Sequence, residues 1–182
     1  MTTKSGRNFE ALVNRPSLDT FFLQDDNLIP NSSLPLLIYR RAVKLTEMDP
    51  AETFEELFES NRWTNSWRNG IYPFHHYHST THEVLGVYSG SAEVQFGGEN
   101  GIVQTIYSGD VVVIPAGVAH KNRGCSDDFA IVGAYPEGKE WDINYGREQE
   151  RPGANENLKH VELPAVDPVY GRSGPLLRLW KM

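Results

Sequence analysis

The sequence predicts an all-β protein: a small barrel of the jelly-roll kind with one short helix and a long C-terminal arm. Three observations lead to this fold class. Short runs rich in β-branched and aromatic residues recur at even spacing between residues 83 and 135, separated by glycine turns. One stretch, beginning at Asp49, carries a helix start. After Pro136 the composition becomes polar and charged.

The 182 residues are enough for one domain, which we expect to span residues 1–182. Within it we expect a core at residues 70–135, an N-terminal strand and helix at 20–62, and an arm at 136–182. Residues 1 to about 20 are polar with scattered apolar positions and are expected to be partly loose. The apolar run at residues 36–43 is predicted to be a strand on the outside of a sheet.

The helix start has a physical basis. Asp49 can cap the helix, Pro50 suits a first position that needs no N–H, and Glu52 completes a capping-box spacing. The helix is expected to end near Asn61. It carries one apolar stripe that should pack against the barrel, made of Phe54, Leu57 and Phe58.

Five further strands form the predicted barrel, at residues 83–88, 92–96, 102–107, 110–114 and 129–135. Glycine-rich turns stand between the first four of them, as a closed antiparallel sheet requires. The arm that follows is expected to run over the surface. Its residues 175–180 are apolar enough to dock on the barrel or on a second subunit.

Four of the six histidines fall between residues 75 and 82, directly before Glu83. If residues 70–78 form an extended strand, His76 and His78 point to one face and a short turn returns Glu83 to them. Imidazole and carboxylate together suit a divalent transition metal. The same alternation sends His75 to the opposite face, and a strand beginning at Glu83 does so to His82.

Alternation also predicts a pocket wall beside these histidines. Tyr72 and Phe74 fall on the face of His76 and His78, inside the barrel, where they either line a pocket or fill the interior. Leu85, two residues after Glu83, shares its inward face and is a further pocket candidate.

Two stretches of the sequence match the two motifs of the cupin superfamily. The first has the form G-x5-H-x-H-x4-E-x6-G and the second G-x5-P-x-G-x2-H, and their fixed positions are Gly70, His76, His78, Glu83, Gly90, Gly109, Pro115, Gly117 and His120. The sequence therefore resembles the cupins, whose fold is a double-stranded β-helix with a metal inside. The resemblance implies that His120 completes a ligand set of His76, His78 and Glu83.

The second motif departs from the family pattern at one position. Cupins usually carry Asn four residues after the histidine, where this chain has Gly124, while Asn122 stands two residues after it. Asn122 is therefore a pocket candidate rather than a ligand. Beyond the motifs, the sequence is similar to that of the YjlB-like cupins, a bacterial group, in residues 66–70, 75–90, 119–122 and 167–171.

Three imidazoles and one carboxylate leave a divalent ion with a net charge of about +1 and two open positions in an octahedral site. The ligand types allow iron, manganese, nickel, cobalt, copper or zinc. We expect an enzyme with oxygenase-, isomerase- or decarboxylase-type chemistry on a small oxygen-bearing metabolite. The alternatives are a module that binds or senses a small ligand without turnover, a purely structural metal, and a pocket that has lost its metal.

Composition limits the partners. The net charge of −7 and the pI near 5.3 argue against nucleic acid and anionic membranes. No signal peptide or membrane-spanning run is visible in the sequence, and the single Cys125 excludes an internal disulfide, so a reducing cytoplasm is expected. Cys125 is a structural cysteine or a thiol at the edge of the site. The apolar stretches at residues 36–43 and 175–180 predict a homodimer.

Overall fold

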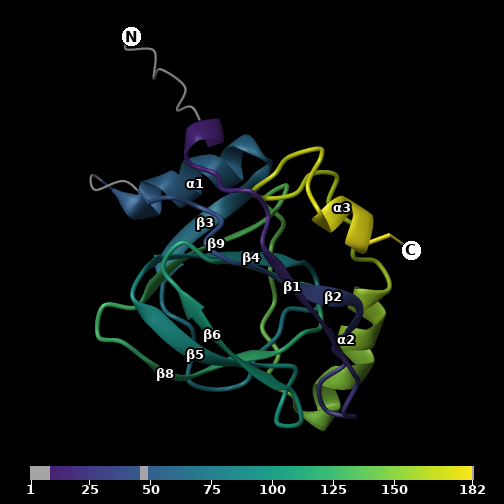
Figure 1. Cartoon of the computed structure of the whole chain (residues 1–182). Helices are drawn as coiled ribbons and strands as arrows, with labels where there is room; N and C mark the ends of the chain where they lie inside the picture. The colour runs from purple at the N-terminus through teal and green to yellow at the C-terminus, as the bar shows by residue number, and fades with distance from the viewer. Residues whose placement is uncertain (1–8, 46–48, 182) are drawn as a thin grey trace.

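The computed structural model describes residues 9–45 and 49–181 (Figure 1), so the part of the N-terminal expectation that concerns residues 1–8 lies outside it. The predicted all-β fold is confirmed: two antiparallel sheets form a jelly-roll barrel. A six-stranded sheet has the order β1-β2-β7-β4-β9-β3, and a three-stranded sheet has the order β6-β5-β8. The strands are β1 (Leu18–Leu23), β2 (Ser32–Tyr39), β3 (Trp63–Asn69), β4 (Glu83–Ser89), β5 (Ser91–Phe96), β6 (Ile102–Tyr107), β7 (Val111–Ile114), β8 (His120–Cys125) and β9 (Ala130–Pro136).

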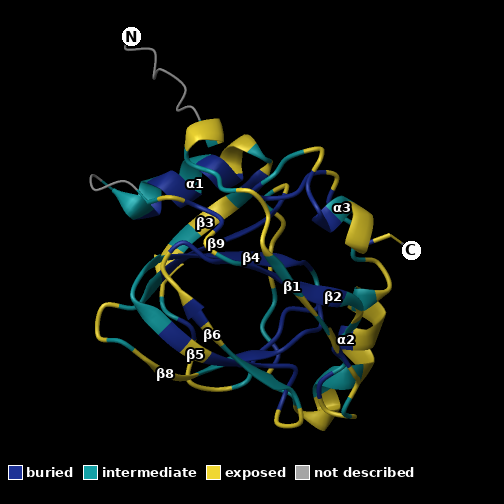
Figure 2. Cartoon of the chain, viewed as in Figure 1, coloured by how far each residue is buried: buried dark blue, intermediate teal, exposed yellow. Residues whose placement is uncertain are grey.

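The six-stranded sheet is buried on both faces, so its strands alternate between two hydrophobic cores. Leu36 and Ile38 of β2 belong to the core inside the barrel, whereas Leu37 and Tyr39 belong to the core on the outer face. Helix α1 (Pro50–Ser60) and the C-terminal arm cover that outer face. Figure 2 shows the resulting buried residues along β4 in the middle of the sheet.

Helix α1 begins where the sequence predicts. The side chain of Asp49 accepts hydrogen bonds from the backbone N–H groups of Ala51 and Glu52, each at 3.1 Å. Phe54 is fully buried and its ring occupies the space that a side chain on Gly86 of β4 would need. A Cβ at Gly86 would lie 2.4 Å from Cδ1 of Phe54, so the strand approaches the helix as closely as its backbone permits.

Replacing Phe54 by alanine is therefore expected to lower the free energy of unfolding by about 3–5 kcal/mol, because the ring leaves a cavity against Gly86 that the backbone cannot fill. Urea denaturation followed by circular dichroism measures the change. The matched control is Glu59→Ala on the exposed side of the same helix, with an expected change within about 0.5 kcal/mol. Equal losses in both variants would contradict this packing.

Two N-terminal expectations need correction. The strand predicted at residues 36–43 starts earlier, at Ser32, and ends at Tyr39, where the chain turns through Arg41 with a positive φ of 48°. It does not lie at the outside of the sheet, because β1 pairs along its free edge. Strand β1, which begins inside the region expected to be loose, was missed, since an edge strand keeps polar residues such as Asp19 and exposed ones such as Phe22.

The strand predicted at residues 70–78 is wrong. The regular strand β3 ends at Asn69, and the following segment forms no continuous ladder: it has isolated bridges of His76 with His120 and of Tyr77 with Asn144, and its carbonyls at Tyr72 and His78 accept single bonds from the N–H groups of Asn122 and Gly117. Pro73 lacks the N–H that a ladder needs, so the segment crosses the mouth of the barrel without pairing regularly. As a result Tyr72 and Phe74 lie at the rim, 46% and 41% exposed, rather than inside.

The arm after Pro136 contains two helices that the sequence did not predict, α2 (Arg151–Leu158) and α3 (Leu176–Leu179). Its apolar end docks on the barrel of its own chain: Leu176 is fully buried, and the indole N–H of Trp180 donates to the carbonyl of Pro35 at 2.9 Å. Both stretches that suggested a homodimer thus contact the same chain, and the homodimer stays a prediction. No helix in residues 9–45 and 49–181 is long and apolar enough to span a membrane.

Candidate metal centre

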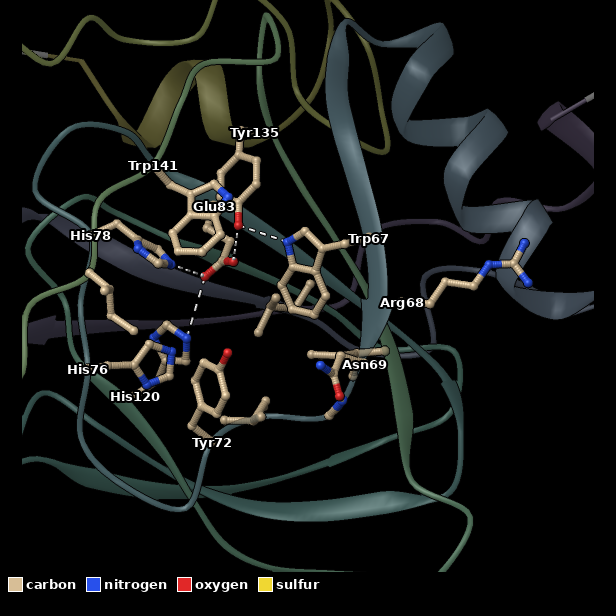
Figure 3. A pocket seen from close by; sticks show the side chains of 15 residues that line it. Trp67, Arg68, Asn69, Tyr72, His76, His78, Glu83, His120, Tyr135 and Trp141 are labelled. Carbon is tan, nitrogen blue, oxygen red and sulfur yellow. Dashed lines mark hydrogen bonds and ion pairs between the residues drawn. The ribbon is translucent and has the colours of Figure 1, made fainter.

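The fold brings His76, His78, Glu83 and His120 together on the floor of a cavity (Figure 3). Glu83 is the first residue of β4, and His120 is the first residue of β8. The bridge between His76 and His120 joins the segment at residues 70–78 to β8. All four side chains belong to the buried set. The Nε2 atoms of His78 and His120 lie 3.4 Å and 3.5 Å from Oε2 of Glu83.

One of the two carboxylate oxygens of Glu83 is held by a hydrogen bond, and the other is not. Its Oε1 accepts a hydrogen bond from the hydroxyl of Tyr135 at 3.1 Å, and that hydroxyl accepts one from the indole N–H of Trp67 at 2.8 Å. Its buried Oε2 has no hydrogen-bond partner among the residues that the structure describes. The arrangement leaves one carboxylate oxygen without a hydrogen bond, at ion-pair distance from two imidazoles that point toward it.

Backbone carbonyls set the orientation of two of the rings. Nδ1 of His76 lies 3.2 Å from the carbonyl of Phe74, and Nδ1 of His78 lies against the carbonyl of Asp142. A ring that donates from Nδ1 presents an unprotonated Nε2 to the centre, which is the usual preparation of a metal-binding histidine. Nδ1 of His120 has no such partner within the described residues.

Burial governs the protonation of these histidines. It lowers the pKa of His76, and it lowers the pKa of His120 far below its ordinary value, with the neighbouring rings of His76 and His78 adding to the effect. Burial also acts on His78, but the carboxylate of Glu83 and the Asp142 carbonyl outweigh it and raise the pKa of His78. The centre therefore favours neutral imidazole at His76 and His120, the form that binds a metal.

Asp142, from the C-terminal arm, organises the turn that carries His78. Its carboxylate accepts hydrogen bonds from the backbone N–H of Ser79 at 2.6 Å, the hydroxyl of Ser79 at 2.5 Å and the backbone N–H of Thr80 at 3.2 Å. The side chain of Asn144 donates to it at 2.7 Å. These bonds lower the pKa of Asp142 although burial opposes them. Sequence reasoning missed this residue, because no local pattern links it to position 78.

Asp142→Ala is expected to weaken metal binding at the proposed site about 10–100-fold, because the turn of Ser79 and Thr80 loses the carboxylate that fixes His78. Competition with a chelator of known affinity measures the change, and circular dichroism verifies that the fold is kept. Glu140→Ala, an exposed carboxylate on the same segment, is the control and should bind metal like the wild type. Unchanged affinity in the folded Asp142 variant would contradict a positioning role.

The cavity above the four side chains has a volume of about 180 Å³. Two of the four predicted pocket residues line it, Tyr72 and Leu85, and the other two, Phe74 and Asn122, do not. Phe74 stacks outside on Tyr72, with ring centroids 5.0 Å apart, because the bent segment no longer alternates. Sequence reasoning missed several lining residues, among them Trp67, Ile131, Tyr135, Trp141 and Ile143.

The two remaining histidines of the cluster lie away from the centre. Nε2 of His75 is 3.2 Å from Oε1 of Glu99 on the outside of the barrel. Nδ1 of His82 accepts a hydrogen bond from the backbone N–H of Ala116 at 2.9 Å, and its ring packs 4.7 Å from Trp180. Burial lowers the pKa of His82 to about 4, as expected for a neutral ring that joins the barrel to the arm.

The donor set fits a divalent metal by its chemistry, although it does not form a finished coordination sphere. Across residues 9–45 and 49–181, no group of three or more His, Cys, Asp or Glu side chains is placed so that it could hold a metal ion without adjustment. Two donors about 2.1 Å from one ion are roughly 3.0–3.4 Å apart at octahedral or tetrahedral angles. The distances of 3.4 Å and 3.5 Å from Glu83 to the two imidazoles are close to that range.

Comparison with known proteins agrees with the fold and the motifs. The cupin family model matches residues 57–139, and the chain belongs to the cupin family. A relative is "Uncharacterized protein YjlB" of Bacillus subtilis (strain 168), which is 44% identical over 162 residues, covering 88% of this chain and 95% of that protein.

Solved structures are more distant. Procruciferin, the 11S globulin of Brassica napus, is 24% identical with a TM-score of 0.36; the match covers 44% of this chain and 21% of procruciferin, so this chain spans about a fifth of it. The epimerase RmlC from Legionella pneumophila Philadelphia 1 is 17% identical with a TM-score of 0.37, and the match covers 68% of this chain and 74% of that one.

Proposed function

We propose that this cupin binds one divalent transition metal through His76, His78, Glu83 and His120 and acts as an enzyme on a small oxygen-bearing molecule that chelates the ion. The observation that carries the proposal is the buried Oε2 of Glu83, which has no hydrogen bond among the described residues and lies between two imidazole Nε2 atoms at 3.4 Å and 3.5 Å. A buried carboxylate oxygen without a hydrogen bond is costly unless a cation beside it compensates its charge.

The bound ion would supply Lewis acidity, and in the case of a redox-active metal also electron transfer. The chain's own contribution is to orient the proposed ligands and to exclude water. Tyr135 holds Oε1 of Glu83 and so leaves Oε2 for the ion. The Nδ1 contacts of His76 and His78 fix their rings, and the apolar residues of the cavity keep bulk water from the ion.

A ligand-binding or sensing role without turnover is the second candidate, and the scarcity of proton-transfer groups favours it. Beside the four proposed ligands, the described lining residues offer the hydroxyls of Tyr72 and Tyr135 for proton transfer. Tyr135 is engaged with Glu83 and Trp67, and burial raises its pKa. Tyr72 is then the remaining group that could move a proton during a reaction.

The test is the metal content of protein purified without a histidine tag, followed by a screen for oxygen uptake and product formation with small chelating metabolites. We expect close to one ion per chain. Product formation that depends on the ion supports the enzyme, and tight binding without product supports the sensing role. A folded chain that takes up no divalent metal in titration would contradict both.

The homodimer and the absence of a nucleic-acid partner are proposed with the same function. Light scattering at micromolar concentration is expected to give the mass of a dimer, and a monomer mass would refute that expectation.

A further inference from the structure

We propose that the molecule bound at this site is flat, about the size of a single ring, mostly apolar apart from a chelating oxygen pair, and charged no more than −1. Single-ring hydroxyketones and catechols are molecules of this class. The inference rests on the proposed metal site and adds to it a substrate class, read from the size, the walls and the charge of the cavity.

The size of the cavity admits one ring. Its volume is about 180 Å³. An apolar cavity of about 150 Å³ is enough for benzene, while pockets for drug-sized ligands run from roughly 300 to 1,000 Å³. A ring with a few substituents therefore fits above the four proposed ligands, whereas a molecule with several rings or a nucleotide exceeds this volume.

The walls of the cavity are flat and apolar. Leu85 and Ile131 contribute branched side chains from β4 and β9, and Trp67, Tyr72 and Trp141 contribute aromatic rings. Figure 3 shows Trp67, Tyr72 and Trp141 arranged around the space in front of Glu83. Aromatic walls favour planar guests, which they contact by stacked or edge-on packing.

The indole of Trp67 is fixed before any ligand arrives. Its N–H donates to Tyr135, and a Cβ at Gly133 would lie 2.2 Å from its Cζ2, so the ring rests directly on the backbone of β9. A wall that is already rigid loses little freedom on binding. This preorganisation favours a rigid planar molecule over a flexible chain.

Within residues 9–45 and 49–181, the cavity offers no permanent cation to a second anionic group. Arg68 is the lining residue with a permanent positive charge, and Figure 3 shows its guanidinium turned away from the cavity. It is paired there with Glu55 at 2.7 Å and with Asp49 at 3.3 Å. A 2+ ion beside one carboxylate neutralises about one negative charge, so the second charge of a dianion would stay uncompensated against apolar walls.

The test uses the full chain loaded with Zn²⁺, which adds no redox chemistry, and compares two chelators by calorimetry. Tropolone is a flat, monoanionic ring, and oxalate is a dianion without a ring. Each affinity is divided by the affinity of the same chelator for free Zn²⁺, which removes its intrinsic preference. We expect this relative affinity to be at least about tenfold higher for tropolone.

Two variants separate the contribution of the aromatic wall to chelator affinity from the contribution of the charge on Arg68. Trp141→Ala should lower the relative affinity of tropolone about two- to tenfold and leave that of oxalate unchanged, because one aromatic face is lost. Arg68→Ala should change neither, because the guanidinium points away.

Equal relative affinities, or a preference for oxalate, with zinc still bound would overturn the substrate class and leave the proposed metal site intact. Loss of oxalate binding in Arg68→Ala would show that the guanidinium serves the cavity and would overturn it as well. A chain that takes up no Zn²⁺ would overturn the proposed function and this inference together. Zinc content measured in the same samples distinguishes these cases.

Discussion

Replacing His78 or His120 by alanine is expected to remove most of the bound metal, while His75→Ala keeps full occupancy. Each of the first two side chains directs Nε2 at Oε2 of Glu83, and each variant removes one of the four proposed donors. Because loss of a group that merely supports a ligand costs about 10–100-fold in affinity, loss of a ligand should cost more than that. His75 points instead to Glu99 on the outside of the barrel.

Metal analysis of variants purified side by side without a tag measures the occupancy, and circular dichroism confirms the fold. His75→Ala is the matched control, because it removes the same group from the position next to His76. His82→Ala should also keep its metal, at some cost in stability, since its ring supports Ala116 and Trp180 rather than the centre. Loss of metal from folded His75→Ala, or full occupancy in His120→Ala, would refute the ligand set.

Asp167→Ala is expected to destabilise the fold by about 3–5 kcal/mol, because several buried donors lose one acceptor together. The carboxylate is fully buried. One oxygen accepts from the backbone N–H groups of Val169 and Tyr170, both at 2.9 Å. The other accepts from the hydroxyl of Tyr39 at 2.6 Å and from the N–H of Leu176 at 3.1 Å. The residue thus joins the C-terminal arm to β2.

Urea denaturation gives the free energy of unfolding of this variant. Asp167→Asn keeps the shape and one acceptor oxygen, so a smaller loss than in Asp167→Ala is expected. Some loss remains, because the amide nitrogen cannot accept from the N–H of Leu176. Asp127→Ala is the surface control, expected within about 0.5 kcal/mol of the wild type. A loss in Asp167→Ala no larger than in the control would contradict the role of this residue as an anchor.

The barrel could be predicted where its strands carry their own pattern. Strands β4, β5, β6, β7 and β9 were predicted to within one residue at each end, because their β-branched residues and glycine turns are local signals. Strand β8 was not, since its sequence from His120 to Cys125 is almost entirely polar. It is a strand because it pairs with β5, and pairing is a tertiary property.

The candidate site was predictable only in part, for a similar reason. Fixed motif spacing indicates the four proposed ligands, yet the extended strand assumed for residues 70–78 sent Phe74 into a barrel that it does not enter. Trp141 and Asp142 reach the site from the arm, 63 residues after Ser79 in the case of Asp142. A single sequence carries no signal for a contact at that separation.

The hydrogen bond between Trp180 and Pro35 joins residues 145 positions apart, and this has a consequence for synthesis on the ribosome. At roughly 5–20 residues per second, the strand that carries Pro35 waits roughly 7–30 s for its partner. Until the arm is made, the nascent barrel exposes the apolar face that α3 later covers, and the turn of His78 lacks the carboxylate of Asp142, which follows Ser79 by 63 residues. The histidines are therefore translated before the carboxylate that holds their turn, so metal loading at the proposed site is expected to follow synthesis of Asp142.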